Sequence, residues 1–204
     1  MSAAQLPPLH LSEPSPGQPV EGVEARPVGM TGMVVFLAGV TVLFLALVIA
    51  YIVEHAKITI GMPALPWVFW ISTFVVLLSS VFLNYAIQSA RLMHPTAAHR
   101  ALLSATGLGY LFLGLQAPGL IMLAQLAMPF RAVSSTLYVL TFLLIALHLM
   151  HVVGGVAYLT VASLRSEKHH YESGDIGQLR PLSVYWHYLA VVWVLLFSML
   201  LILN

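Results

Sequence analysis

The sequence contains no cysteine, which excludes disulfides, thiolate metal sites and cysteine nucleophiles. It is also poor in charge. Only 7% of its residues are Asp, Glu, Lys or Arg, whereas a soluble domain usually carries about 25%. A net charge of +1 provides no basic field for nucleic acid and no acidic tail, so no soluble polyanionic partner is expected. With 60% hydrophobic residues, the composition is that of a membrane protein.

The amino-terminal segment differs from the rest. Residues 1–28 are rich in proline, with small and acidic residues between the prolines and no apolar period. This composition predicts a disordered or extended tail. The lead before the first apolar stretch is long and acidic, and that stretch is long enough to span a bilayer. We therefore expect the first helix to be retained and not cleaved as a signal peptide.

Residues 29–204 contain five apolar runs. A bilayer core requires roughly 20 apolar residues per helix, since backbone polar groups in lipid must be satisfied within the segment. The fold class is therefore predicted to be all-α, a polytopic membrane domain of five transmembrane helices. The predicted spans are 29–53, 65–90, 101–127, 134–164 and 181–203.

The basic residues between the spans are distributed unevenly. Those on the side of the amino terminus are Arg26, Arg91, Arg100, Arg165, Lys168 and Arg180, whereas Lys57 and Arg131 lie on the other side. The positive-inside rule therefore predicts a cytoplasmic amino terminus and an external carboxyl terminus at Asn204. The longest connection, residues 166–180, is predicted to be a solvated loop, too short for a domain of its own.

Small residues indicate where helices approach closely. Ala101, Ala105 and Gly109 repeat at a spacing of four, which gives the third span a face that a neighbouring helix can contact. Gly154 and Gly155 are expected to do the same on the fourth span.

Proline interrupts the third span. Pro118, flanked by glycines and two residues after Gln116, is expected to kink that helix and to free one carbonyl. A packing kink is the interpretation we favour over a ligand site, because proline and glycine are common in membrane helices.

Three histidines are the ionisable residues placed within spans. His148 and His151 lie one helical turn apart and share a face, and His187 lies near the start of the fifth span. One interpretation is a haem or metal site with an imidazole pair from facing helices. The interpretation we favour is neutral imidazoles that hydrogen-bond to backbone, a neighbouring helix, another subunit or a lipid headgroup.

Other chemistries find little support in the spans. A proton relay or coupled carrier usually requires a buried carboxylate, and the interior of the spans has none. We find no repeated half of the kind that secondary transporters show. No span pairs a Ser or Asp nucleophile with a base, so a hydrolase is not indicated either.

The last span carries a dense motif, YWHYLAVVWVLLF at residues 185–197. It resembles the last-helix motif of subunit III of the haem-copper respiratory oxidases. The matching positions are Tyr185, Trp186, His187, Tyr188, Val191, Val192, Trp193 and Phe197. Because Trp186 and Trp193 are seven apart, they lie on one side of that helix.

Further segments resemble the same family in order along the chain. HLMHVVGG (148–155) resembles its His-x-x-His-Val stretch, and residues 31–51 resemble the opening helix of its short, five-helix form. LLSSV (77–81) and LGYLFLGLQ (108–116) resemble its second and third helices. The resemblance covers roughly residues 30–203.

The sequence also departs from the family pattern, and each departure removes polarity. Val40 stands where the opening helix usually has Glu, and Gly119 and Leu120 replace a Glu-Tyr pair after Gln116. Ala190 stands where the terminal motif has Asp. Ile145 and Ala146 replace Thr and Gly before the two histidines. Roles of those carboxylates in lipid binding or proton uptake therefore do not carry over.

The resemblance implies a non-catalytic accessory subunit of cytochrome c oxidase, without haem or copper of its own, in a V-shaped bundle whose cleft holds phospholipid. Its partners would be the catalytic haem-copper subunit I, which carries haem and copper, and subunit II. That complex reduces dioxygen to water in aerobic respiration and pumps protons. The expected location is a bacterial-type inner membrane. The electron donor, haem types and full subunit composition are not predicted.

We expect no catalytic, cofactor-binding or metal-binding residues in this chain. The residues predicted to contact lipid or the catalytic subunit are His148, His151, Tyr185, Trp186, His187, Trp193 and, more weakly, Gln116. The alternative for each is ordinary hydrogen bonding between helices of the same chain.

Three other functions remain open at this point. The same fold would serve in a quinol oxidase or in a complex associated with nitric oxide reductase. A bis-histidine b-type membrane cytochrome is a second alternative, and a small carrier is a third.

Overall fold

The structure, a computed structural model, describes residues 28–57, 65–128, 135–168 and 176–203. These ranges contain five α-helices and no strand, which confirms the predicted all-α class. The helices are α1 (Val28–His55), α2 (Val68–Arg91), α3 (Pro95–Ala127), α4 (Ser135–Lys168) and α5 (Ile176–Ile202). Each is long and apolar enough to cross a bilayer, as predicted. The predicted tail lies, apart from Val28, outside the described residues.

Several helices are longer than predicted. α3 begins at Pro95, because proline fits the first turn of a helix, where its missing N–H is not needed. α4 continues to Lys168 and α5 begins at Ile176, so the loop predicted at 166–180 is wrong at both ends. Hydropathy detects only the apolar part of a helix, and these helices continue into polar sequence.

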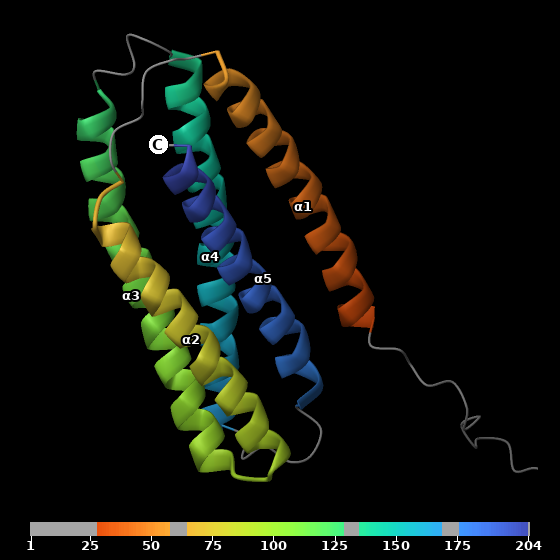
Figure 1. The fold of residues 1–204 in the computed structure, drawn as a ribbon. Coiled ribbons are helices and arrows are strands. Elements are labelled where there is room, and N and C mark those ends of the chain that lie inside the picture. The colour runs from red at the N-terminus through yellow and green to blue at the C-terminus, as the bar shows by residue number, and fades with distance from the viewer. Residues whose placement is uncertain (1–27, 58–64, 129–134, 169–175, 204) are drawn as a thin grey trace, which may run out of the picture.

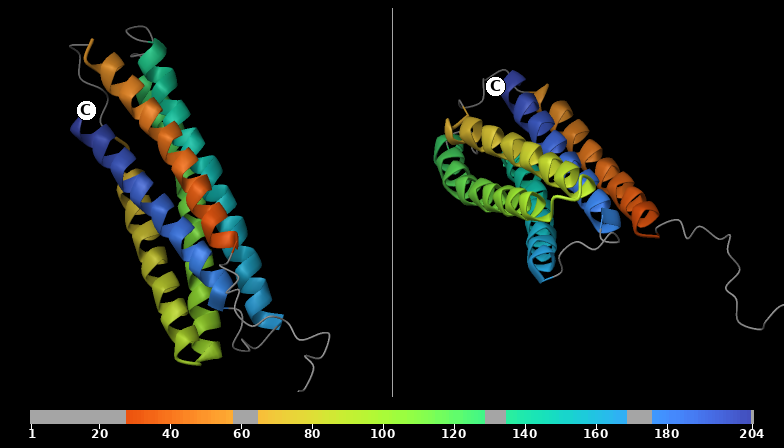
Figure 2. Two further views of the ribbon diagram at one scale, coloured as in Figure 1. Left: turned by 90° about the vertical axis from the view of Figure 1, so that its right-hand side faces the viewer. Right: turned by 90° about the horizontal axis from the view of Figure 1, so that it is seen from below.

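The helices alternate in direction, and the two ends of the described chain lie at opposite ends of the bundle (Figure 1). α2 contacts α3, α3 contacts α4, α4 contacts α5, and α5 contacts α2, so these four helices close a ring. α1 packs against α4 and α5 alone and lies outside that ring (Figure 2). The V-shaped splay implied by the resemblance stays a prediction, since these contacts describe a ring with one helix at its side.

A tight turn joins α2 to α3. Met93 has a positive φ of 59°, and the His94 N–H donates to the Ser89 carbonyl over 2.9 Å. This left-handed residue lets the chain reverse and start α3 immediately at Pro95.

The predicted small-residue face is confirmed on α3, where Ala101, Ala105 and Gly109 are all buried inside the bundle. On α4, Gly155 is buried and Gly154 is exposed, but α5 approaches both: a Cβ at Gly155 would lie 2.9 Å from Leu189 Cδ1, and one at Gly154 would lie 3.6 Å from the Tyr185 hydroxyl. α3 remains helical through Pro118, which is itself exposed. The helix curves along its length (Figure 2) and does not break.

α1 has the smallest share of its residues in the core. Its buried apolar side chains are Leu37, Val40, Phe44 and Tyr51, which share one face toward α4 and α5. The remaining surface is mostly apolar, with Val35 67%, Val42 69% and Phe36 50% exposed. Such a surface is stable in hydrocarbon and unfavourable in water, as a transmembrane helix at the edge of a bundle requires.

Candidate functional site

The seven predicted contact residues lie on α3, α4 and α5, and most of them are inside the chain. His148, Trp186 and Gln116 are each 1% exposed, and Trp193 is 2% exposed. Tyr185 is also buried, whereas His151 and His187 are half-buried. For the four most buried residues, packing between helices of this chain accounts for their position. Contact with a lipid or a partner subunit stays a prediction.

Trp193 lies at the centre of a polar and aromatic cluster that joins four helices. Its indole N–H donates to Thr73 Oγ1 of α2 over 2.9 Å. On α4, His148 stacks on the indole with ring centroids 5.4 Å apart and an interplanar angle of 24°. Phe69 of α2 and Phe112 of α3 meet it edge-on. The terminal motif therefore places its second tryptophan where it links α2, α3, α4 and α5.

His148 is enclosed by aromatic rings. Trp193 stacks on it, and Phe44 of α1 meets it edge-on at 6.2 Å between ring centroids. Neither imidazole nitrogen has a hydrogen-bond partner within the part of the chain that the structure describes. An imidazole in this environment acts as a flat ring for packing.

His151 lies on the same face of α4, as its spacing from His148 predicts, since Phe44 contacts both rings. Its Nδ1 lies 2.7 Å from the Leu147 carbonyl, which only accepts, so the proton is on Nδ1. The Tyr185 hydroxyl donates to the backbone carbonyl of His151 over 2.9 Å and ties α5 to α4. Nε2 is then the nitrogen left to accept a hydrogen bond.

His187 is bound locally within α5. Its Nδ1 donates to the Ser183 carbonyl over 2.7 Å, and its Nε2 is buried without a partner among the described residues. Across those same residues, no group of three or more His, Cys, Asp or Glu is arranged to hold a metal ion.

Trp186 fits into a slot formed by two glycines. A Cβ at Gly109 of α3 would lie 3.1 Å from Trp186 Cη2, and a Cβ at Gly155 of α4 would lie 3.1 Å from its Cε3 and Cζ3. The indole is therefore packed between α3 and α4 as tightly as the missing side chains allow. The two tryptophans of the motif face the interior together, as their spacing of seven predicts.

Gln116 is held by a hydroxyl that the sequence analysis did not single out. Its Nε2 donates to Ser72 Oγ over 3.3 Å, and Ser72 in turn donates to the Phe69 carbonyl. Gln116 Oε1 has no partner in the described ranges. Ser72 and Thr73 could have been predicted as partners, because both are hydroxyl residues within an apolar span, and such side chains commonly hydrogen-bond across helices.

The positions where the family pattern has carboxylates are buried and apolar. Val40 is 5% exposed and Ala190 is 4% exposed. At Gly119, a Cβ would come within 2.7 Å of Phe69 Cε1, so the ring occupies the space of a side chain. At these three positions the interior of this chain is filled by apolar groups.

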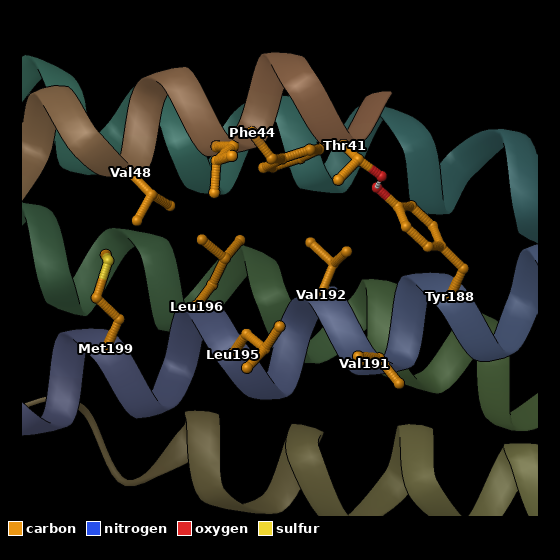
Figure 3. Close-up of a pocket in the computed structure, with 10 residues that line it drawn as sticks. Thr41, Phe44, Val48, Tyr188, Val191, Val192, Leu195, Leu196 and Met199 are labelled. Atoms are coloured by element: carbon orange, nitrogen blue, oxygen red, sulfur yellow. Dashed lines mark hydrogen bonds between the residues drawn. The ribbon is translucent and has the colours of Figure 1, made fainter. Parts of the chain in front are cut away.

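An apolar groove of about 370 Å³ runs along the outside of the bundle between α1 and α5 (Figure 3). Its lining residues are Thr41, Phe44, Leu45, Val48, Tyr188, Val191, Val192, Leu195, Leu196 and Met199. The two hydroxyls in it bond to each other: Thr41 donates to the Leu37 carbonyl, so Tyr188 donates to Thr41 Oγ1 over 2.9 Å. The groove therefore presents hydrocarbon along its length and no free polar group from these two side chains.

The sequence matches the family model for cytochrome c oxidase subunit III over residues 22–203. Among curated proteins, it is 29% identical over 127 residues to cytochrome c oxidase subunit 3 of Lumbricus terrestris. That alignment covers 62% of this chain and 47% of the relative, so the chain matches about half of the relative's length. Because the family model matches nearly all of the described helices, this chain belongs to the cytochrome c oxidase subunit III family.

Proposed function

We propose that this chain is the accessory subunit III of a haem-copper terminal oxidase, bound in the membrane to the catalytic subunit I and to subunit II. Membership of the subunit III family is the observation that carries the proposal. The interior supports it, because Trp193, Gln116 and Tyr185 hydrogen-bond to groups on neighbouring helices of the chain, and His148 packs between aromatic rings.

The charge distribution supports an orientation with the amino terminus in the cytoplasm. Arg91 ends α2, and Arg100 and Arg165 lie at the same end of the bundle, whereas Lys57 follows α1 at the other end. Lys57 is also paired with Glu54 over 2.7 Å. Under the positive-inside rule, this excess of arginine supports a location of the α2–α3 turn on the inner side of a bacterial-type membrane.

Purification in mild detergent tests the partner and the reaction together. A tagged full-length chain should copurify with a haem-copper catalytic subunit, and the complex should consume dioxygen with reduced cytochrome c as donor. Turnover with quinol or nitric oxide in place of these substrates would assign the chain to a sister complex. A haem spectrum from the isolated chain, or recovery of a stable monomer that transports a solute, would contradict the proposal.

Lipid binding is the second part of the proposal, and the groove between α1 and α5 is the site we assign to it. We propose that it holds one acyl chain of a phospholipid. From Tyr188 to Met199 a helix rises about 16 Å, which matches one leaflet of a hydrocarbon core about 30 Å thick. The lining is almost entirely apolar, as an acyl chain requires.

The length and lining of the groove support a single acyl chain as its occupant. Its ten lining residues come from two helices and form one strip of apolar surface on the outside of the bundle. The lipid headgroup would then lie at the carboxyl ends of α1 and α5.

Two leucines of α1 provide a matched test of this site. Leu45 lines the groove, whereas Leu43 does not, and both are exposed, at 57% and 45%. Leu45→Trp should fill the groove and lower the amount of phospholipid retained by the washed complex, measured by mass spectrometry of extracted lipid. Leu43→Trp should retain the wild-type amount. Equal retention by both variants would exclude this groove as the lipid site.

A further inference from the structure

Trp193 of α5 contacts α2, and Trp186 lies two turns earlier in α5. The two helices are antiparallel (Figure 1), and Trp193 of α5 bonds to Thr73 of α2. Seven residues further along α2 is Ser80, and seven residues back along α5 is Trp186. Each step covers two turns, or about 10.5 Å. A constant antiparallel register therefore predicts that Ser80 faces Trp186 as Thr73 faces Trp193.

The second pair is buried but not bonded. Trp186 is 1% exposed and Ser80 is 8% exposed. Trp186 Nε1 and Ser80 Oγ both lack a hydrogen-bond partner among the residues that the structure describes. An indole N–H only donates, and a hydroxyl both donates and accepts, so the two groups are complementary. Leaving both unsatisfied in a membrane interior is unfavourable.

The direction of the indole agrees with this register. Gly109 of α3 lies against Cζ2 and Cη2, on the edge that carries Nε1, whereas Gly155 of α4 lies against the opposite edge at Cε3 and Cζ3. The N–H edge therefore faces away from α4 and toward α3. One turn before Gly109, the Ala105 carbonyl accepts from Ser79 Oγ over 2.9 Å, which brings α2 to the same level. Ser80 is the next residue of α2.

We propose that one water molecule bridges Trp186 Nε1 and Ser80 Oγ and forms an internal hydration site between α2, α3 and α5. The water accepts from the indole N–H and donates to the serine oxygen. Two polar partners are what a buried water needs as a minimum. α5 then bonds to α2 at two levels: directly from Trp193 to Thr73, and through a water molecule from Trp186 to Ser80.

Polar side chains on α3 and α4 lead toward this site from one end of the bundle. His99, which is half-buried, lies 2.6 Å from Ser166 Oγ. Further in, Ser163 Oγ and Thr106 Oγ1 are 2.9 Å apart, and Thr106 directly follows Ala105. This series of polar side chains is the path by which we expect water to reach the site.

Nuclear magnetic resonance of the indole protons tests the site in the full-length chain, with ¹⁵N-labelled tryptophan in lipid nanodiscs. The chain has 4 tryptophans, and Trp186→Phe and Trp193→Phe assign the two resonances. Magnetisation transfer from water should reach the Trp186 indole proton. Trp193 is the internal control, since its direct bond to Thr73 should prevent that transfer.

Two small substitutions distinguish a bridging water from a direct hydrogen bond between Trp186 and Ser80. Ser80→Ala should shift the Trp186 indole resonance, abolish its transfer from water and leave the Trp193 resonance unchanged. Thr73→Ala should shift the Trp193 resonance instead. Absence of transfer from water at Trp186 in the wild-type chain would overturn the hydration site. A Ser80→Ala shift without such transfer would indicate a direct bond and would also overturn it.

Discussion

The indole N–H of Trp193 donates to Thr73 Oγ1 over 2.9 Å and joins two helices whose residues are 120 positions apart in the chain. Thr73 can accept this bond because its own proton goes to the Phe69 carbonyl. The bond secures α5 against α2 at the point where His148 and Phe112 also contact the indole. The most recognisable part of the sequence thus serves to close the ring of helices.

Thr73→Val should weaken that closure. The substitution keeps the shape of the side chain but leaves the Trp193 N–H buried without an acceptor, which costs about 1 to 2 kcal/mol of unfolding free energy. Unfolding of the purified chain in mixed detergent micelles, followed by tryptophan fluorescence, measures the loss. Ser104→Ala is the control, because Ser104 is exposed and bonds only within its own helix. If both variants lost the same unfolding free energy, the hydrogen bond between Trp193 and Thr73 would have no special role in stability.

Gly119→Ala and Gly114→Ala should have opposite effects although both glycines lie in α3. A Cβ at Gly119 would lie 2.7 Å from Phe69 Cε1, and overpacking of this kind costs about 1 to 3 kcal/mol. At Gly114 nothing lies within 4 Å of the added Cβ, so the helix gains up to about 1 kcal/mol in propensity. Thermal unfolding measures both. Adding Phe69→Leu to Gly119→Ala should recover part of the loss, and failure to do so would point away from this clash.

Val40→Glu restores the family's carboxylate and should destabilise this chain. Val40 is 5% exposed and belongs to the apolar core, so an unpaired charge there costs about 3 to 5 kcal/mol. The expected result is a lower yield of folded protein from membranes. Val40→Met adds a side chain of similar length without a charge, so it should cost only the overpacking part of the loss, about 1 to 3 kcal/mol. Wild-type yield with Glu would mean that the surrounding helices still accommodate an acid.

His148→Phe should leave stability unchanged or raise it, because it removes two buried nitrogens without partners and keeps a ring between Trp193 and Phe44. His148→Ala should cost about 2 to 5 kcal/mol, because it leaves a cavity. Unfolding measurements distinguish the two variants. Copurification of His148→Phe with the catalytic subunit, at wild-type oxidase turnover, is also expected. Loss of turnover with a stable chain would show that the imidazole itself is required.

Much of the architecture follows from the sequence alone. Five apolar runs determine five helices, since a membrane leaves the backbone no other way to satisfy its polar groups. The spacing of seven between Trp186 and Trp193, and of three between His148 and His151, determines which side chains share a face. These predictions of shared faces are confirmed, because the position of a side chain around a helix depends only on residues of the same helix. Helix ends such as Pro95 and Lys168 were missed, because hydropathy does not detect a helix that continues beyond the bilayer.

Only the tertiary structure decided which faces meet and which polar groups find partners. The sequence left open whether His148 and Trp193 face lipid, another subunit or their own chain, because an apolar face is equally suited to each. Packing placed both inside, brought Thr73 to Trp193 and left the Ser80 hydroxyl and the Trp186 N–H without a hydrogen-bond partner among the described residues. Such contacts depend on the register between helices far apart in sequence, and that register is set by the fit of side chains such as Phe69 against Gly119.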